Sequence, residues 1–208
     1  MKEIDVYKVL EGKNPKLARR VPRFVVDYLR RTIHEREVNE ILARFGDLEG
    51  IAFVRAALGY MNVRYHSVGM ERLNPEGRYV FASNHPFGGM DGLMLADEVA
   101  RYFGDVRVVV NDLLMYLGPL RGLFVPVNKH GRQDAGSVEA FNNAFASDVP
   151  IVTFPAGLCS RRRRGVVRDL EWKPNFVKKA AAYGRDVVPV YFNGRLSDFF
   201  YRLSNLRT

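Results

Sequence analysis

Hydrophobic side chains between residues 21 and 45 recur every three or four positions, and charged side chains fill the positions between them. Phe24, Tyr28 and Leu42 belong to this apolar stripe. Such spacing predicts an amphipathic helix that ends at Gly46, followed by a second short helix over about 48–58. We expect segment 1–62 to be a helical pair packed on a core. The alternative is that its basic amphipathic surface lies on a membrane.

From residue 63 onward, short runs rich in β-branched and aromatic residues replace the helical pattern. The predicted strands are 63–68, 79–82, 106–110, 123–127, 149–154 and 187–192, and the predicted helices are 93–102, 136–146 and 175–183. This alternation predicts an α/β fold, a sandwich in which helices flank a mixed, mostly parallel sheet. We expect residues 63–208 to form this αβ domain and to make a single structural unit with segment 1–62. In such folds functional groups collect in the loops at the carboxyl ends of the strands.

The composition is that of a folded protein, but its charge is strongly basic. Of the 208 residues, 47% are hydrophobic and 26% are charged, and the net charge is +9. The positive charge predicts an anionic partner, which could be nucleic acid, anionic lipid or an acidic carrier protein. The opening residues contain no apolar core of a secretion signal, and no apolar run is long enough for a membrane span. The only cysteine, Cys159, excludes an intramolecular disulfide and fits a reducing compartment.

The loop after the predicted strand 79–82 carries groups suited to proton transfer. It reads Asn84-His85-Pro86-Phe87-Gly88-Gly89-Met90-Asp91-Gly92. The imidazole of His85 can take a proton from an attacking hydroxyl or amine, and the carboxylate of Asp91 can orient the ring and stabilise the imidazolium. Gly88 and Gly89 allow the loop to fold back so that the two side chains meet. The structural alternative is a histidine bonded to backbone and an aspartate that caps the next helix.

A second polar segment follows the predicted strand 149–154. It reads Phe154-Pro155-Ala156-Gly157-Leu158-Cys159-Ser160, and four arginines come directly after it. Backbone N–H groups of such a turn can receive an oxyanion or a phosphate, and arginines add charge-assisted contacts. The alternative for the arginines is a solvated loop or a nucleic-acid patch. Two further apolar strands with a proline and a polar exit, 123–129 and 187–195, are informative only through their order after the His85 loop.

In that order the four segments resemble the sequence blocks of the glycerolipid (lysophospholipid) acyltransferase superfamily, over about residues 63–194. The resemblance implies an αβ sandwich and attack of an acceptor on an acyl thioester of acyl-carrier protein or coenzyme A, with no further cofactor. It implies His85 and Asp91 as the catalytic pair. The substrate-binding residues that it implies are Asn84, Gly88, Gly89, Phe154, Pro155, Ala156, Gly157, Ser160, Arg161, Arg162 and Arg163.

Two departures from the superfamily pattern bear on this expectation. Five residues, Pro86 to Met90, separate His85 from Asp91, where the family has four. Ala156 stands where the family has a glutamate that helps hold the glycerol-phosphate acceptor. The residue patterns of both segments are similar to those of the hemolysin-like branch, whose N-acyltransferases make ornithine or glycine lipids.

The resemblance to that branch implies transfer of a 3-hydroxyacyl chain from acyl-carrier protein to the amine of an amino acid such as ornithine or glycine. The alternative within enzymes is O-acylation of lysophosphatidate or another lysolipid. The implied partners are acyl-carrier protein, the amino-acid or lysolipid acceptor and an anionic membrane surface. We therefore expect a cytoplasmic protein associated peripherally with the inner face of the membrane.

Hypotheses from other classes remain open at this point. Cys159 could be a nucleophile paired with His85. A basic nucleic-acid-binding module is disfavoured because no aromatic residues interleave the arginines, so no nucleic-acid partner is expected. A pseudoenzyme is a further alternative, given the altered interval. The four histidines show no metal-ligand spacing, and no metal site is predicted.

Overall fold

The computed structural model describes residues 4–13, 15–32, 34–127 and 135–204, and the chain divides into two compact units. The first unit is Met1–Val63 with Leu113–Gly122, and the second is Arg64–Asp112 with Leu123–Thr208. The sequence-based boundary at residues 62 and 63 lies beside the first of these divisions. The return of segment 113–122 to the first unit is a long-range feature of the chain, which local patterning does not register.

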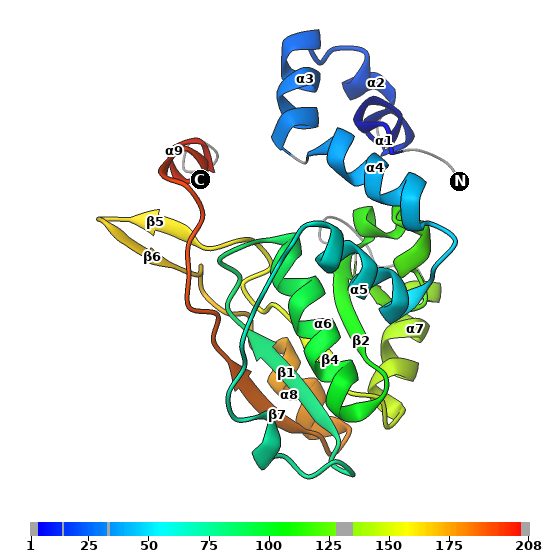
Figure 1. Ribbon diagram of the computed structural model, residues 1–208, viewed down its shortest axis with the longest axis vertical. Coiled ribbons are helices and arrows are strands. Elements are labelled where there is room, and N and C mark those ends of the chain that lie inside the picture. Colours follow the sequence, from blue (N-terminus) through cyan, green and yellow to red (C-terminus); the bar gives the residue numbers. More distant parts are fainter. Residues whose placement is uncertain (1–3, 14, 33, 128–134, 205–208) are drawn as a thin grey trace. The chain divides into compact units, whose positions relative to one another are not determined.

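The first unit is helical, and it contains more helices than the predicted pair. Its helices are α1 (Val6–Lys13), α2 (Pro15–Ala18), α3 (Arg23–Thr32), α4 (Glu35–Phe45), α5 (Gly50–Tyr60) and the short 3-10 helix η3 (Gly118–Leu120), while η2 (Asp112–Tyr116) begins at the boundary. The prediction of one helix over 21–45 was wrong. Figure 1 shows α3 and α4 as separate helices. His34, at the N-cap position of α4, has a left-handed conformation with φ of 55°. Both pieces are amphipathic, so the apolar spacing continues across the break and hides it.

The second unit is built around a five-stranded sheet, which confirms the predicted α/β class. The elements are η1 (Met70–Arg72), β1 (Tyr79–Ser83), α6 (Gly89–Phe103), β2 (Arg107–Asn111), β3 (Phe124–Val127), α7 (Ala135–Ala146), β4 (Ile151–Thr153), β5 (Arg161–Arg163), β6 (Val166–Arg168), α8 (Asn175–Ala182), β7 (Asp186–Val190) and α9 (Asp198–Ser204). The strand order is β3-β2-β4-β1-β7, and every neighbouring pair in this sheet is parallel.

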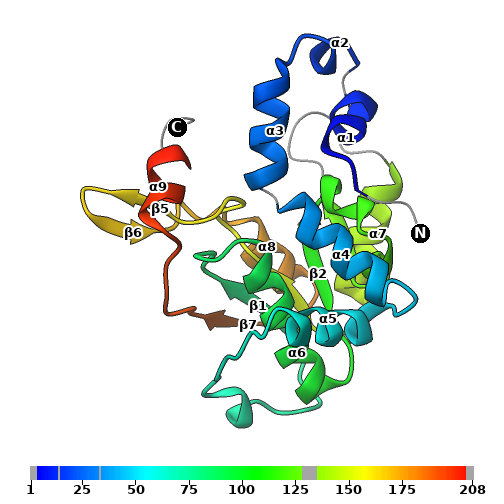
Figure 2. The ribbon, with the colours of Figure 1, turned by 45° about the horizontal axis from the view of Figure 1, so that its top comes forward.

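Alternate side chains of β1 pack on opposite faces of this sheet, and helices cover both faces (Figures 1 and 2). Val80 belongs to a buried cluster with Phe145 of α7 and Ala180 of α8. The next residue, Phe81, lies against Phe103 at the end of α6, with ring centroids 5.8 Å apart. The sheet is therefore buried on both sides, which explains why its strands read as nearly continuous apolar runs.

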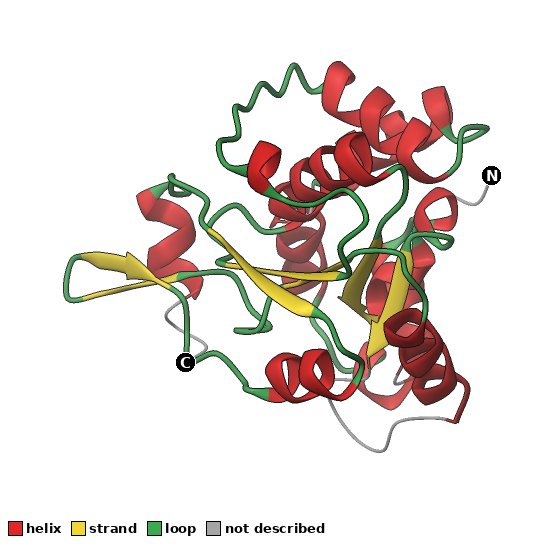
Figure 3. Ribbon diagram, turned by 90° about the horizontal axis from the view of Figure 1, so that it is seen from below, coloured by secondary structure: helices red, strands yellow, loops and turns green. Residues whose placement is uncertain are grey.

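Two parts of the second unit differ from the sequence-based expectation. Segment 63–68, predicted as a strand, is extended but pairs with no strand in the described structure. Its side chains bind α6 instead, since Tyr65 donates to Asp97 at 2.6 Å and Ser67 donates to Glu98. An antiparallel hairpin of β5 and β6, which was not predicted, stands apart from the parallel sheet (Figure 3). The run of arginines lacks the alternation of apolar and polar residues from which a strand is normally predicted.

No helix in the described ranges is both long and apolar enough to cross a membrane.

Candidate active site

The strand order places three of the four predicted segments side by side. Strands β4, β1 and β7 are neighbours and run in parallel, so their carboxyl ends lie at the same edge of the sheet. The loops that leave them carry Phe154, His85 and Tyr191 respectively. The remaining segment forms β3 at the far edge of the sheet, and its predicted polar exit, Asn128-Lys129, lies outside the described residues.

The side chains of His85 and Asp91 meet, as predicted. Nδ1 of His85 lies 3.0 Å from Oδ2 of Asp91, and the side chains are 18% and 0% exposed. The extra residue between them is absorbed by the start of α6: Gly88 has φ of 68° and precedes the helix, and Asp91 lies in its first turn. The capping alternative for Asp91 was wrong, because Gly88 holds the N-cap position and the Asp91 carboxylate points to His85 and to the N–H of Phe87, 2.8 Å away.

Burial decides the electrostatics of this pair. Desolvation raises the pKa of Asp91 above its ordinary 3.8, while the contacts with His85 and with the N–H of Phe87 oppose that shift. A buried carboxylate gains most from a neighbouring positive charge, so Asp91 is placed to stabilise positive charge that develops beside it. Because Asp91 lies at Nδ1, the other ring nitrogen, Nε2, is the one left for proton exchange with a substrate.

The Phe154 segment forms one wall beside the histidine. The rings of Phe154 and His85 lie with centroids 4.2 Å apart and planes inclined by 30°. The chain then turns sharply, since Gly157 has φ of 65° and its N–H donates to the carbonyl of Phe154 at 2.8 Å. Pro155 and Ala156 are buried, and Ala156 is only 6% exposed. The methyl group that replaces the family glutamate therefore fills a packed position, and no carboxylate stands there to contact an acceptor.

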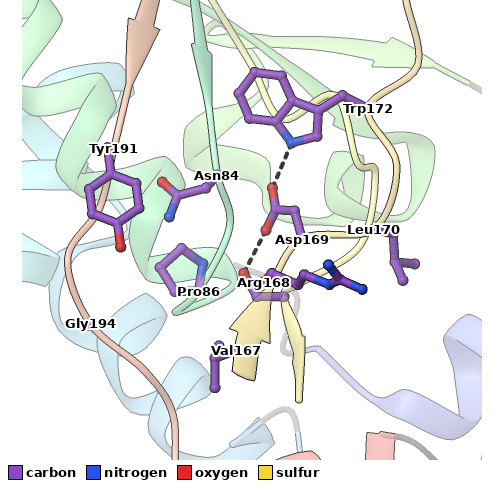
Figure 4. Close-up of a pocket in the computed structure, with 10 residues that line it drawn as sticks. Asn84, Pro86, Val167, Arg168, Asp169, Leu170, Trp172, Tyr191 and Gly194 are labelled. Atoms are coloured by element: carbon purple, nitrogen blue, oxygen red, sulfur yellow. Dashed lines mark hydrogen bonds between the residues drawn. The ribbon is translucent and has the colours of Figure 1, made fainter. Parts of the chain in front are cut away.

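Sequence reasoning missed Asp169, which holds the backbone of the candidate catalytic histidine. Its Oδ1 accepts the N–H of His85 at 3.1 Å and the hydroxyl of Ser160 at 2.5 Å. Its Oδ2 accepts the indole N–H of Trp172 at 2.9 Å, as Figure 4 shows. The N–H of Ser160 donates in turn to the carbonyl of His85 at 2.9 Å. Both backbone polar groups of His85 are thereby held. The only local signal was an acidic residue three positions before the single tryptophan, which does not point to a distant histidine.

A cavity of about 390 Å³ lies against this network (Figure 4). It is lined by Asn84, Pro86, Ser160, Val167, Arg168, Asp169, Leu170, Trp172, Tyr191 and Gly194. Of the predicted substrate-binding residues, Asn84 and Ser160 line it. The amide of Asn84 is also structural: it donates to the carbonyl of Phe192 at 3.0 Å and accepts the N–H of the same residue at 2.7 Å. These bonds hold the exit of β7 beside that of β1.

The arginine run does not form one cluster. Arg161 is buried and donates to the carbonyl of Cys159 at 2.7 Å, so it holds the turn that precedes it. Arg162 pairs with Asp198 of α9 at 2.8 Å. Arg163 is exposed on β5. Of the predicted glycines, Gly88 is buried against Sγ of Cys159 and Gly89 is exposed at the start of α6.

Cys159 lacks the surroundings of an activated nucleophile. Burial raises the pKa of its thiol above the ordinary 9.0, and the charge of Asp91 acts in the same direction, although Arg161 opposes it. A thiol in such a place stays protonated near neutral pH, and it is the thiolate that attacks. Within the part of the chain that the structure describes, no three His, Cys, Asp or Glu side chains are grouped to hold a metal ion.

Comparison with known proteins identifies the family of this chain. A family model described as "Acyltransferase" matches residues 8–208. A lyso-glycine lipid O-acyltransferase from Bacteroides thetaiotaomicron is 46% identical over 204 residues, which are 98% of this chain and 75% of that protein. A protein of the same name from Phocaeicola vulgatus is 44% identical over 204 residues, 98% of this chain and 73% of its own length.

These relatives confirm the predicted resemblance to acyltransferases, including those of glycine lipids. Their names specify transfer to oxygen, whereas the leading sequence-based hypothesis was transfer to an amine. Because the family model matches nearly the whole of this chain, the chain belongs to the acyltransferase family and is an enzyme that transfers acyl groups.

Proposed function

We propose that this enzyme transfers an acyl chain from an acyl thioester to a hydroxyl group of a lyso-glycine lipid, a step in aminolipid synthesis. The observation that carries the proposal is the contact of 3.0 Å between His85 Nδ1 and Asp91 Oδ2. The cavity beside it is lined by Asn84 and Pro86, the two chain neighbours of His85. The similarity to two lyso-glycine lipid O-acyltransferases supports the choice of acceptor.

His85 acts as general base and then as general acid. Its Nε2 takes the proton of the acceptor hydroxyl while the oxygen attacks the thioester carbonyl carbon. The tetrahedral intermediate then collapses, the carbon–sulfur bond breaks, and the imidazolium returns the proton to the departing sulfur. The products are an ester and a free thiol. Asp91 stabilises the imidazolium between the two steps and keeps the ring in the productive tautomer.

The cavity offers an anionic acceptor one cationic side chain among its lining residues. Arg168 provides a cation on its wall, and the carboxylate of Asp169 already accepts three hydrogen bonds. The headgroup carboxylate of an N-acylated glycine would find Arg168 as its charge partner. Ala156 supports an acceptor other than glycerol phosphate, since it removes the glutamate that the family uses for that substrate.

The donor in this proposal is a thioester of acyl-carrier protein, with coenzyme A as the alternative. The net charge of +9 favours an acidic carrier protein as a partner. Transfer to the amine of free glycine or ornithine is the competing hypothesis, and transfer to lysophosphatidate is a third.

The test is a matrix of donors and acceptors with purified protein. Acyl and 3-hydroxyacyl thioesters of both carriers are each combined with lyso-glycine lipid, glycine, ornithine and lysophosphatidate, and products are measured by mass spectrometry. We expect an ester of lyso-glycine lipid, abolished in H85A and retained in H66A, which removes an exposed histidine outside the site. Product from a free amino acid or from lysophosphatidate, with none from lyso-glycine lipid, would refute the proposal.

A further inference from the structure

The β5–β6 hairpin ends in a two-residue turn whose conformation is unusual for its sequence. Arg164 has φ of 50° and Gly165 has φ of 80°, and the strands close around them with Arg163 opposite Val166. Two successive residues with positive φ are typical of a type I′ turn, which favours asparagine or glycine at the first position. An arginine there accepts an unfavourable backbone conformation, so the hairpin carries a positive charge at its tip at a cost in conformational energy.

The side chains around this tip are exposed, whereas one side chain at its base, that of Arg161, is buried. Val166 is 59% exposed, and Arg163 and Arg164 are exposed beside it. At the base, Arg161 is buried against the carbonyl of Cys159. Figures 1 and 3 show the hairpin extending away from the parallel sheet of its unit. The hairpin therefore ends in the apolar side chain of Val166 beside Arg163 and Arg164.

The same hairpin leads directly to the active site. Within β6 the exposed Val166 is followed by Val167 and Arg168, which line the cavity of about 390 Å³. The next residue, Asp169, binds the backbone N–H of His85. Three residues, 166–168, therefore separate the Arg164-Gly165 turn from Asp169, the residue that holds the backbone of His85. A lipid acceptor that leaves a bilayer at the tip has a short path along β6 to the cavity.

We infer that the tip of this hairpin docks on an anionic lipid bilayer, with Val166 entering the interface and Arg164 contacting lipid phosphates. The functional reason for this docking rests on the proposed lipid acceptor. The docking itself does not, because bilayer binding is measurable without turnover. An arginine near an anionic bilayer surface contributes about 1 kcal/mol, a factor of about five in affinity. The exposed valine distinguishes this surface from a purely basic patch for an acidic carrier protein, where an apolar side chain gains less.

The first experiment measures sedimentation with vesicles of phosphatidylcholine alone and of phosphatidylcholine with phosphatidylglycerol. R164N removes the charge and places a favoured residue in the turn, and V166T removes an apolar methyl group while keeping the β-branched shape. We expect R164N to bind the anionic vesicles about fivefold more weakly, and R164N/V166T about twentyfold more weakly, with no loss of thermal stability.

The matched control is R36Q, which removes one exposed charge from the first unit. Unchanged binding of R36Q supports a specific site, whereas equal losses in R36Q and R164N indicate a general charge effect and overturn the inference. Wild-type protein that ignores anionic vesicles also overturns it. Loss of binding in F24A but not in the hairpin variants also overturns it, because Phe24 is an exposed aromatic residue of α3 and lies outside the hairpin.

A second experiment separates docking from chemistry. The R164N/V166T variant is assayed with a short-chain acceptor in solution and with a long-chain acceptor in anionic vesicles. We expect wild-type kcat/KM for the dissolved acceptor and a loss of about twentyfold for the embedded one. Equal losses for both, or a loss that follows the carrier protein rather than the vesicle, overturn the inference. Absence of all turnover would count against the proposed function and leave the vesicle result standing.

Discussion

Nδ1 of His85 lies 3.0 Å from Oδ2 of Asp91, although the interval between the two residues is one longer than in the superfamily pattern. Gly88, with φ of 68°, turns the chain immediately before α6 begins, and the first turn of the helix delivers Asp91 to the ring. The two side chains therefore meet in the geometry that the proposed proton transfer requires. The altered interval, which raised the possibility of a pseudoenzyme, is compatible with contact between the two candidate catalytic side chains.

Asp91→Asn is expected to separate activity from stability. The amide cannot stabilise the imidazolium of His85, so kcat should fall by about 10³–10⁴-fold, as in other histidine–aspartate pairs. Burial raises the pKa of Asp91, which means that the folded state does not favour the buried charge, and a neutral isostere should unfold at the same or a higher denaturant concentration. A variant that loses activity only because it unfolds earlier would contradict this division of roles.

The free energy of unfolding should depend on pH through the titration of Asp91. Because its folded pKa is raised above 3.8, the folded protein binds more protons at this group than the unfolded chain does at pH values between the two. The contribution is fully present below 3.8 and is lost as pH rises through the raised folded value. Denaturant unfolding across pH should therefore show D91N gaining stability relative to wild type as pH rises, then levelling off. A constant difference would show that the group titrates normally.

Asp169 is expected to affect turnover through the position of His85. In Asp169→Asn, an amide NH₂ group replaces one of the two carboxylate oxygens that now accept hydrogen bonds. The loss of a hydrogen bond to a charged group should lower kcat by about 10–100-fold. S160A and W172F each remove one donor and should cost less. Steady-state kinetics distinguish the alternatives, because an increase in KM with unchanged kcat would mean that Asp169 acts on substrate binding in the cavity and not on the position of His85.

Gly194 and Phe87 form a close contact that a side chain would disrupt. A Cβ on residue 194 would overlap the ring of Phe87, whose N–H donates to Asp91. Gly194→Ala should destabilise the fold by about 1–3 kcal/mol through overpacking and should lower activity as well. The double variant G194A/F87L should lose less stability than the sum of the single variants, as measured in a double-mutant cycle. Strict additivity would mean that the two residues are not in contact.

Cys159→Ala should leave turnover within about twofold of wild type, because His85 acts directly on the acceptor and no thiolate attacks. The raised pKa of the thiol is consistent with this expectation. Burst kinetics provide the complementary measurement, since an acyl-enzyme on Cys159 would release thiol before any ester product forms. A large loss in C159A together with such a burst would restore the cysteine mechanism.

Local patterns in the sequence were enough to predict much of the second unit. Five of the six predicted strands and all three predicted helices exist there, because period-two and period-3.6 spacings reflect burial on a sheet or a helix face. His85 and Asp91 were also identifiable, since their chemistry and spacing lie within one loop.

Tertiary structure decided the features that depend on residues distant in the chain. Segment 63–68 has the composition of a strand, but Tyr65 and Ser67 bind the carboxylates of α6 and no neighbouring strand accepts the segment. Asp169 joins the active site only because β5 and β6 return it to the backbone of His85, 84 residues earlier in the chain. The sequence by itself determined which side chains can do the chemistry. The parallel order β4-β1-β7 decided which of them meet, because strand neighbours are chosen by packing across the whole sheet.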